Sequence, residues 1–548
     1  MADEKEVAAI HTGTDSPPPG PEADKKYGIK EHWKCLAACT LVSMCPFQYG
    51  LDFGLIGGLQ AMVGFLKIFG HPAPELPSGW NIDTERQQLI SSLMTLGAFI
   101  SSSAAGPIAG VMSRRMAIWS ASLLCIVSNI IMMSTTNIGG LYAGRLLIGL
   151  ANGMFMTFSQ LYIQECSPAR YRGLMISSFQ VWTSLGSLVG TIVDNFTEKI
   201  DGRNSYLIPL GLIYIMPVLM SLGLLLIPES PRWLMQHGKP EQARKALRWH
   251  RPFPEARIDA EIRDIEVALE TESHHKSIPV WDMFRDPVDR RRTVLAVCGL
   301  TVQGASGAMY MIAYGTYFFR MAGIGQPFEN SCILNGVGIV AILINSALIT
   351  NFGRRRVFLV SGLVLCGLAQ LLTAVVYTVN PGTKSTGQAI VALAVIYIFG
   401  YNGMVATYAW VSGGELPSQR LRSYTFGLAT AVGFFAAWLT TFTAPYFINP
   451  EALNWGPKYG YIWLPSCLIS AAWVYFFLPE VKNRTLEEID EMFEARLPAK
   501  KFRKYVCVVH RPVGVAAKGS DGTVASGSDV DTGSKKGEDV VHAEEVKV

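Results

Sequence analysis

Long runs of apolar residues constrain this chain more than any other feature of its sequence. A helix that crosses a lipid bilayer needs about 20 mostly apolar residues, and about twelve such runs occur along the chain. They lie near 35–58, 88–110, 117–135, 141–162, 174–194, 207–227, 294–318, 331–350, 357–378, 389–412, 423–446 and 459–478. Half of the 548 residues are hydrophobic and only 16% are charged, below the share of about 25% in soluble proteins. We therefore predict an all-α membrane protein.

Basic residues gather in alternate connections between these runs. The connections contain "SRRM" (113–116), "PARYRG" (168–173), the region 228–293, "GRRRV" (353–357) and "SQRLRS" (418–423). Because Lys and Arg are enriched in cytoplasmic loops, we predict that these connections and both termini are cytoplasmic. A connection on the other side contains Asn195-Phe196-Thr197, which matches a glycosylation acceptor. Such triplets also arise by chance, so both interpretations of Asn195 stay open.

The sequence indicates no cofactor, no metal site and no enzyme chemistry. The ten cysteines fall mainly in or beside the apolar runs or on the predicted inner side, which is typical of reduced packing residues. There is no Gly-rich phosphate loop, no metal-ligand cluster and no nucleophile with a matching base. Residues 1–30 are polar, acidic and Pro-rich, so we expect no cleavable signal peptide and an uncleaved first span.

Short motifs recur in the two halves of the chain. "SRRM" returns as "GRRRV", and "PESPR" (228–232) returns as "PEVK" (479–482). Internal repeats with a site between them are the architecture of alternating-access transporters. We predict five regions: a disordered cytoplasmic tail at 1–33, a six-helix bundle at 34–228, a linker with short amphipathic helices at 229–290, a second six-helix bundle at 291–480, and a C-terminal helix with a disordered tail at 481–548.

Several motifs together carry a family resemblance. "GLDFGLIGG", "AGRLLIGLANG", "ECSPARYRG", "PESPRWL", "VQGASG", "GELPSQRLRS" and "LPEVKNRTLEEIDEMF" resemble, in order and spacing, the signatures of the sugar porter family of the major facilitator superfamily, in particular its fungal hexose and α-glucoside members. The resemblance covers roughly residues 35 to 495. It implies the major facilitator fold, with twelve transmembrane helices in two pseudo-symmetric six-helix bundles.

One acid lies inside the first apolar run. An ionised carboxylate at the middle of a bilayer costs about 2.5–3.5 kcal/mol even on lenient scales, so Asp52 must face the interior, be paired or be protonated. The resemblance implies that Arg145 is its partner and that the two form a switchable pair for proton coupling. Two other interpretations remain open, namely a static pair that fixes helix packing and a hydrated acid in the outer vestibule.

The resemblance also implies a substrate site. Gln180, Gln303 and Trp410 match family positions that read sugar hydroxyls and cover the sugar ring. Other polar positions of the family pattern are replaced, by Gly304, Met309 and Gly338, which predicts a roomier and more apolar pocket. Residues that could supply replacement contacts are Asn335, one turn before Gly338, and Tyr310, Tyr314, Asn402 and Tyr408.

A cytoplasmic gate is implied as well, in which acids and arginines of each half bind the other half when the cavity faces outward. The residues that match it are Arg114, Arg115, Glu165, Arg172, Glu229, Arg232, Arg354, Arg355, Glu415, Arg422 and Glu480. The family acid that precedes the loop is replaced by Gly110 and Thr350, so fewer pairs are expected. Ordinary enrichment of basic residues in inner loops is the alternative explanation of the arginines.

Together these observations predict a plasma-membrane transporter, expected to act as a monomer, that imports a sugar or sugar-like polyol by proton symport. Its expected partners are the small-molecule substrate, protons and the lipid bilayer, with no nucleic acid. The alternatives are a facilitator without proton coupling, an exporter of a fungal metabolite and a nutrient sensor.

Overall fold

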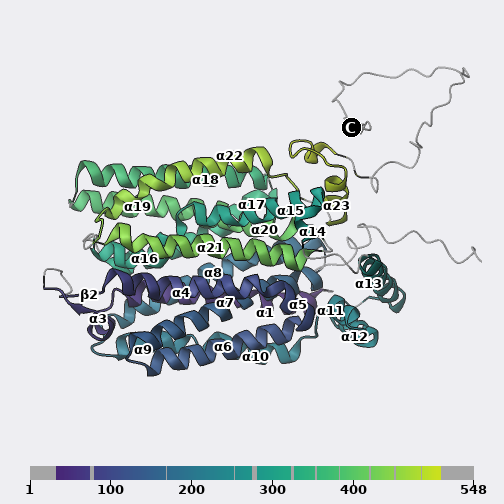
Figure 1. The fold of residues 1–548 in the computed structure, drawn as a ribbon, viewed down its shortest axis with the longest axis horizontal. Helices are drawn as coiled ribbons and strands as arrows, with labels where there is room; N and C mark the ends of the chain where they lie inside the picture. Colours follow the sequence, from purple (N-terminus) through teal and green to yellow (C-terminus); the bar gives the residue numbers. More distant parts are fainter. Residues whose placement is uncertain are drawn as a thin grey trace, which may run out of the picture.

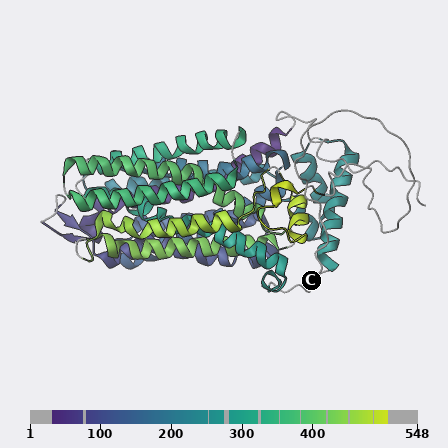
Figure 2. The ribbon, with the colours of Figure 1, turned by 90° about the horizontal axis from the view of Figure 1, so that it is seen from above.

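The computed structural model describes residues 32–74, 79–167, 169–251, 253–274, 281–321, 326–351, 354–381, 383–418, 421–449, 452–482, 484, 486–505 and 507. Residues 1–31 of the predicted tail at 1–33, and 508–548 of the predicted C-terminal region at 481–548, lie outside these residues. The long helices run side by side along one axis (Figure 1 and Figure 2). Helices α11–α14 and α23 gather at one end of the bundle, here called the linker end, and strands β1 and β2 lie at the opposite, distal end (Figure 1).

The first half of the chain combines long helices with several short helices and two short strands. Its elements are α1 (Trp33–Ser43), α2 (Cys45–Leu59), α3 (Val63–Phe69), β1 (His71–Pro72), β2 (Trp80–Asn81), α4 (Thr84–Ser103), α5 (Ala105–Val111), α6 (Arg114–Ser134), α7 (Ile138–Cys166), α8 (Ala169–Thr197), α9 (Asn204–Leu212) and α10 (Ile215–Leu226). The two short strands pair antiparallel, with His71 opposite Asn81.

The second half follows four linker helices, α11 (Pro231–Gln236), α12 (Pro240–His250), α13 (Glu255–His274) and α14 (Asp282–Arg285). Its elements are α15 (Pro287–Ala305), α16 (Ala308–Met321), α17 (Pro327–Asn351), α18 (Arg355–Val379), α19 (Lys384–Gly400), the π-helix η3 (Tyr401–Ala406), α20 (Thr407–Glu415), α21 (Arg422–Ile448), η4 (Gly456–Tyr459), α22 (Gly460–Phe477), α23 (Leu486–Glu494) and η5 (Phe502–Lys504).

Within the described residues, nine helices are long and apolar enough to cross a membrane. Two bent helix pairs, Trp33–Leu59 with Val63–Phe69 and Thr84–Ser103 with Ala105–Val111, raise that number to eleven. The remaining predicted run, 174–194, lies inside α8, a helix of 29 residues. All twelve apolar runs of the sequence therefore coincide with helices.

Helices α2 and α8 lie very close together because glycines face the neighbouring backbone. A Cβ atom added at Gly50 would lie 1.8 Å from the Thr183 carbonyl oxygen, and one at Gly186 would lie 2.1 Å from the Phe47 carbonyl oxygen. No larger side chain fits there without moving a helix. Small residues are the usual means of close helix packing in membranes, where water does not drive helices together. This packing fixes the position of α8 relative to α2.

Between the halves, α4 packs against α21 and α8 packs against α17. The predicted linker helices are present, and α12 contacts α1 while α11 contacts α7. On the linker, Arg248 donates a 2.7 Å hydrogen bond to Glu255, and this bond lowers the pKa of the Glu255 carboxyl group. The linker is thus docked on the first half of the chain.

Candidate functional site

The main cavity of the described residues lies between the two halves and has about 650 Å³ of empty space. Helices α2, α7 and α8 line it from the first half, and α15, α16, α17, α19, η3 and α20 line it from the second. Five of the six residues predicted to bind substrate are in its wall: Gln180, Gln303, Asn335, Asn402 and Trp410. Such a mixture of aromatic and polar lining residues suits a small-molecule ligand.

The two glutamines of the cavity present free amide groups. Within the described residues, neither Gln180 nor Gln303 has a side-chain hydrogen-bond partner in the protein. Asn335 differs, because its Oδ1 accepts from Ser187 at 2.8 Å and its Nδ2 donates to the Ser331 carbonyl oxygen at 3.0 Å. An amide is both a donor and an acceptor, so each free glutamine can bind a hydroxyl group in either role.

A helix break places Gln303 at the cavity. Helix α15 ends at Ala305 and α16 begins at Ala308, with Gly307 between them at a φ of 79°. Only glycine adopts this left-handed conformation easily, and a Cβ atom there would also lie 2.4 Å from the Trp463 ring. The carbonyl groups freed by the break accept hydrogen bonds, as when Tyr397 donates to Ser306 at 3.1 Å. The break is therefore stabilised by its surroundings.

A second irregular segment places Asn402. It lies in the π-helix η3, which separates α19 from α20, and π-turns are frequent at functional sites. Its amide fills the space beside Gly338, where a Cβ atom would lie 2.3 Å from the Asn402 Nδ2 atom. Asn402 thus occupies the room left by the missing side chain at position 338.

Aromatic side chains form much of the remaining wall. The rings of Trp410 and Phe179 lie with centroids 4.7 Å apart, and Tyr49, Phe53 and Tyr401 also line the cavity. Phe179, Tyr49 and a polar stripe on α8 are site features that were not predicted from the sequence. That stripe has a visible signal, since Gln180, Thr183, Ser184 and Ser187 recur at helical spacing. The cavity therefore offers both polar groups on α8 and flat aromatic surfaces.

The expected contribution of Tyr314 to the site is wrong. Tyr314 lies on α16, is 1% exposed and does not line the cavity. Its hydroxyl group donates instead to the Thr441 carbonyl oxygen of α21 at 2.7 Å. A buried hydroxyl group needs such a partner, and here the helix backbone supplies it. Tyr310 is likewise engaged elsewhere, because it donates to Gln370 at 2.8 Å.

Asp52 and Arg145 are in direct contact beside the cavity. The Nη1 atom of Arg145 lies 2.7 Å from the Asp52 Oδ1 atom, and the side chains are 1% and 2% exposed respectively. Arg145 also donates to the Ile90 carbonyl oxygen at 2.9 Å and contacts the Met94 sulfur at 3.4 Å. Within the described residues, the second Asp52 oxygen has no partner. Tyr49 and Phe53, on the same helix, line the cavity, so the pair and the cavity share α2.

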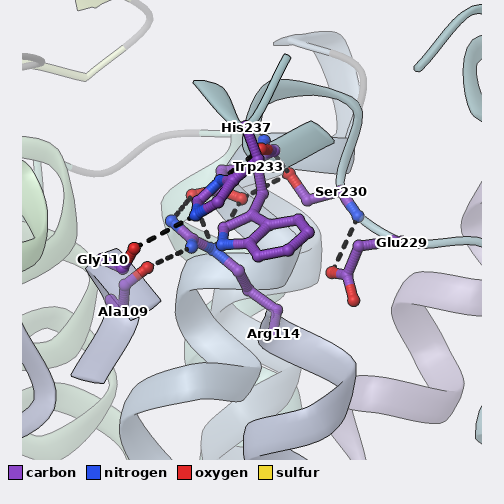
Figure 3. A network of polar contacts seen from close by, with 8 residues as sticks. Ala109, Gly110, Arg114, Glu229, Ser230, Trp233 and His237 are labelled. Atoms are coloured by element: carbon purple, nitrogen blue, oxygen red, sulfur yellow. Dashed lines mark hydrogen bonds and ion pairs between the residues drawn. The ribbon is translucent and has the colours of Figure 1, made fainter. Parts of the chain in front are cut away.

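At the linker end, arginines and acids of the first half bind each other. Arg114 donates to Glu165 at 2.7 and 3.1 Å, and Glu165 also accepts from the Ser230 hydroxyl group at 2.5 Å. Figure 3 shows Arg114 pointing toward Ala109, His237 toward Gly110 and Ser230 beside Glu229. His237 Nε2 lies 3.1 Å from the Gly110 carbonyl oxygen, so the linker contacts the position in α5 where the family acid is missing.

The second half repeats these contacts. Arg355 pairs with Glu415 as Arg114 pairs with Glu165. The backbone N–H of Arg356 donates to Glu480 at 3.0 Å, and that of Arg115 donates to Glu229 at 3.2 Å. The duplication is thus visible in the structure, in a register that matches Arg355 and Arg356 with Arg114 and Arg115. Arg354, expected to be one of these partners, is the exposed residue before α18.

The described acid–arginine pairs join residues of the same half, whereas pairs across the halves were expected. Arg232 lies on α11 and Arg422 begins α21, while the side chain of Arg172 lies outside the described residues. Besides the bond between Ser187 and Asn335 in the cavity wall, hydrogen bonds across the halves lie toward the distal end. Asn449 donates to Thr84 at 3.0 Å and to Gln87 at 2.9 Å, and Tyr317 donates to Asn81 at 3.3 Å. The distal end is therefore closed in this conformation.

The predicted glycosylation acceptor lies at the distal end. Asn195 is half-buried in the last turn of α8. The Thr197 hydroxyl group donates to the Val193 carbonyl oxygen at 3.0 Å. Modification of Asn195 stays a prediction.

Comparison with known proteins gives consistent matches along most of the chain. The model of the family described as "Sugar (and other) transporter" matches residues 38–493. The major facilitator-type transporter ecdD of Aspergillus rugulosus is 26% identical over 475 residues, which are 84% of this chain and 87% of that protein. The low-affinity glucose transporter HXT3 of Saccharomyces cerevisiae is 27% identical over 474 residues, covering 84% of this chain and 82% of that protein.

Among solved structures, the chain is similar to the proton:xylose symporter XylE bound to 6-bromo-6-deoxy-D-glucose. The TM-score is 0.71 at 19% sequence identity, and the match covers 85% of this chain and 100% of that chain. At this identity the likeness concerns the fold.

Proposed function

Because the chain belongs to the sugar (and other) transporter family, whose model matches residues 38–493, we propose that it carries a sugar or sugar-like polyol through the main cavity by proton symport. The predicted major facilitator fold and the predicted resemblance to fungal sugar transporters are confirmed by the matches. The protein is a sugar transporter of this superfamily and not an enzyme. The substrate, the coupling and the direction of transport are proposals.

The observation that carries the proposal is the pairing of free amides with aromatic surfaces in one cavity. Sugars present hydroxyl groups that both donate and accept, together with nearly apolar ring faces. Gln180 and Gln303 offer unpaired amides, and Trp410 with Phe179 offers flat surfaces. Met309, which replaces a polar position, also lines the cavity and makes it more apolar than a site with amides all round. These features suit a sugar with fewer hydroxyl groups or a larger ligand.

The Asp52–Arg145 pair supports proton coupling. The second oxygen of Asp52 has no partner among the described residues, so a proton can be added there without breaking another bond. When Asp52 is protonated, Arg145 still has a hydrogen-bond acceptor, the Ile90 carbonyl oxygen. Protonation would then weaken the attraction between α2 and α7, and α2 also lines the cavity. Substrate binding and proton binding would act on the same helix.

A facilitator without coupling is the second candidate. Both members of the pair are almost completely buried, and Arg145 holds contacts besides Asp52. Such a pair can serve only to fix helix packing. The two candidates differ in the wild type, because only a proton symporter accumulates substrate under an imposed membrane potential.

For the cell, we propose a plasma-membrane importer that acts as a monomer, with the linker end and both termini in the cytoplasm. The basic residues of the linker-end connections, such as Arg114 and Arg355, support this orientation.

The test is uptake into proteoliposomes with an imposed membrane potential, with D-glucose as the first probe in a panel of sugars and polyols. One proton crossing 100 mV gains about 2.3 kcal/mol, which supports roughly forty-fold accumulation. We expect Asp52→Asn to abolish accumulation and to leave exchange of labelled for unlabelled sugar intact. Asp201→Asn, which changes an exposed acid, is the control. Absence of accumulation in the wild type would establish the facilitator, whereas accumulation by Asp52→Asn equal to that of the wild type would establish a different proton route.

A further inference from the structure

A second buried acid lies between the main cavity and the distal end. Asp194, near the end of α8, is 1% exposed. Within the described residues, neither of its carboxyl oxygens has a hydrogen-bond partner. An ionised carboxylate without a partner is among the most unfavourable groups to bury, and a group in this position takes up a proton instead. Asp52 differs, since it is paired with Arg145.

Asp194 packs against the part of α2 that precedes its break. A Cβ atom added at Gly58 would lie 2.0 Å from the Asp194 Oδ2 atom, so the carboxyl group rests on the α2 backbone. Helix α2 ends one residue later, and α3 continues after a bend of 79°. Movement of the distal part of α2 would therefore uncover Asp194.

A smaller cavity leads from the main cavity toward Asp194. It has about 390 Å³ of empty space and shares Ser187, Asn335 and Ile398 with the main cavity. Thr191, one turn before Asp194 on α8, lines its wall. Water that enters when the distal end opens would come within one helical turn of the carboxyl group.

The titratable groups around Asp194 do not neutralise it. Glu198, one turn later on α8, adds a like charge. On α17, the nearest such groups are Cys332, which interacts electrostatically with Asp194, and Glu329 one turn before it. On α2 the only acid is Asp52, and Arg203, the residue before α9, donates to the Tyr206 hydroxyl group at 3.2 Å.

We propose that Asp194 is a second proton-binding site, neutral while the distal end is closed and ionised when this end opens to water. A proton bound on closing couples the two events, so that acid on the distal side favours closure. If closing binds one proton, the equilibrium constant for closure falls about tenfold for each unit rise in pH. The proposal rests on alternating access through the main cavity but not on proton coupling at Asp52.

The test compares infrared spectra of the purified full chain in lipid at neutral pH, where a protonated carboxylic acid gives a separate C=O stretching band. The variants are Asp194→Asn, Asp52→Asn, the control Glu198→Gln, and Gly57→Trp. A Cβ atom at Gly57 faces the Ala313 carbonyl oxygen of α16 at 3.3 Å, so a tryptophan there should wedge the distal end open.

We expect the wild type, Asp52→Asn and Glu198→Gln to show the protonated band, and Asp194→Asn and Gly57→Trp to lose it. An unchanged band in Asp194→Asn would overturn the proposal, because Asp194 would then be ionised in the closed form. A band that persists in Gly57→Trp would overturn the coupling to opening. If Asp194→Asn does not fold, Asp194→Ser removes the same group in less space, and Gly57→Trp tests the native acid. The infrared result does not depend on whether Asp52→Asn accumulates substrate, so this proposal and proton coupling at Asp52 can fail separately.

Discussion

The free amides of Gln180 and Gln303 are the residues on which recognition depends most directly. They come from different halves of the molecule, on α8 and α15, and meet at one cavity. A ligand that binds both therefore links the halves. This placement makes each glutamine testable separately, because neither supports the other or a neighbouring helix through a hydrogen bond among the described residues.

We expect Gln180→Ala and Gln303→Ala each to weaken the apparent affinity roughly five- to hundred-fold, because unpaired substrate hydroxyl groups cost about 1–3 kcal/mol. The measurement is uptake over a range of substrate concentrations, normalised to surface expression. Tyr314→Phe is the matched control, since it removes a buried hydroxyl group that binds Thr441 away from the cavity. Unchanged affinity in both alanine variants would show that substrate binds elsewhere.

At these positions the sequence predicted most of the site, and its failures have a physical cause. Gln180, Gln303 and Trp410 could be placed because they stand in family motifs. Asn402 was only one of several replacement candidates, because its position beside Gly338 depends on a π-turn that no periodicity in the sequence indicates. Tyr314 was misplaced because a tyrosine in an apolar run can face the cavity or a neighbouring helix, and composition does not distinguish the two.

Among the helices, α2 has the tightest constraints. It carries Asp52, lines the main cavity with Tyr49 and Phe53, and packs against α8 through glycines. A change that separates α2 from α8 would disturb the proton site and the substrate site together.

The contact between α2 and α8 should tolerate no added atom at Gly186. Replacing a helical glycine by alanine usually stabilises a helix by about 0.5–1 kcal/mol. At Gly186 the new Cβ atom would lie 2.1 Å from the Phe47 carbonyl oxygen, so we expect Gly186→Ala to destabilise the protein by about 1–3 kcal/mol. The measurement is the midpoint of thermal unfolding in detergent. Gly211→Ala on α9, which has nothing within 4 Å, is the control and should unfold at the wild-type temperature or above. Equal midpoints would mean that the helices can separate freely.

The apolar runs predicted where the helices lie but not where they break. The run 294–318 was read as one span, yet the structure divides it at Gly307. The run 88–110 bends by 51° between α4 and α5. An apolar run shows that a segment is surrounded by lipid or by other helices. A short break inside the bundle does not interrupt such a run, because neighbouring helices can supply the partners of its backbone groups. Breaks depend instead on neighbours such as Trp463, which come from distant parts of the sequence.

At the scale of the whole molecule, hydrogen bonds at the distal end are among the contacts that join the two halves. Asn449, which follows α21, is 2% exposed and binds two residues of α4. At the linker end, the described ion pairs stay within each half, as Arg114 does with Glu165 and Arg355 does with Glu415. The sequence could not predict which end is closed, because a transporter needs the same residues in both conformations.

Removing the Asn449 side chain should open the distal end. Asn449→Ala deletes hydrogen bonds to Thr84 and Gln87, each worth about 0.5–1.5 kcal/mol net, so the closed form should lose roughly five- to hundred-fold in its equilibrium with the open form. The measurement is the rate at which an impermeant thiol reagent, added from the distal side, labels Ser184→Cys in the cavity wall. Cys298 and Cys332, the two cysteines that are only half-buried, are replaced by Ala in this background.

The control for this experiment is Thr443→Ala on the same helix, because Thr443 donates within α21, to Leu439 and Thr440, and makes no described hydrogen bond to the first half. We expect labelling to be faster in Asn449→Ala than in the control by up to the same factor. The direction follows from the geometry: the two deleted bonds exist only while α21 and α4 touch, so their loss cannot favour the closed form. A labelling rate equal to that of the control would place the closing interactions elsewhere, for example at Tyr317 and Asn81, which join the halves at the same end.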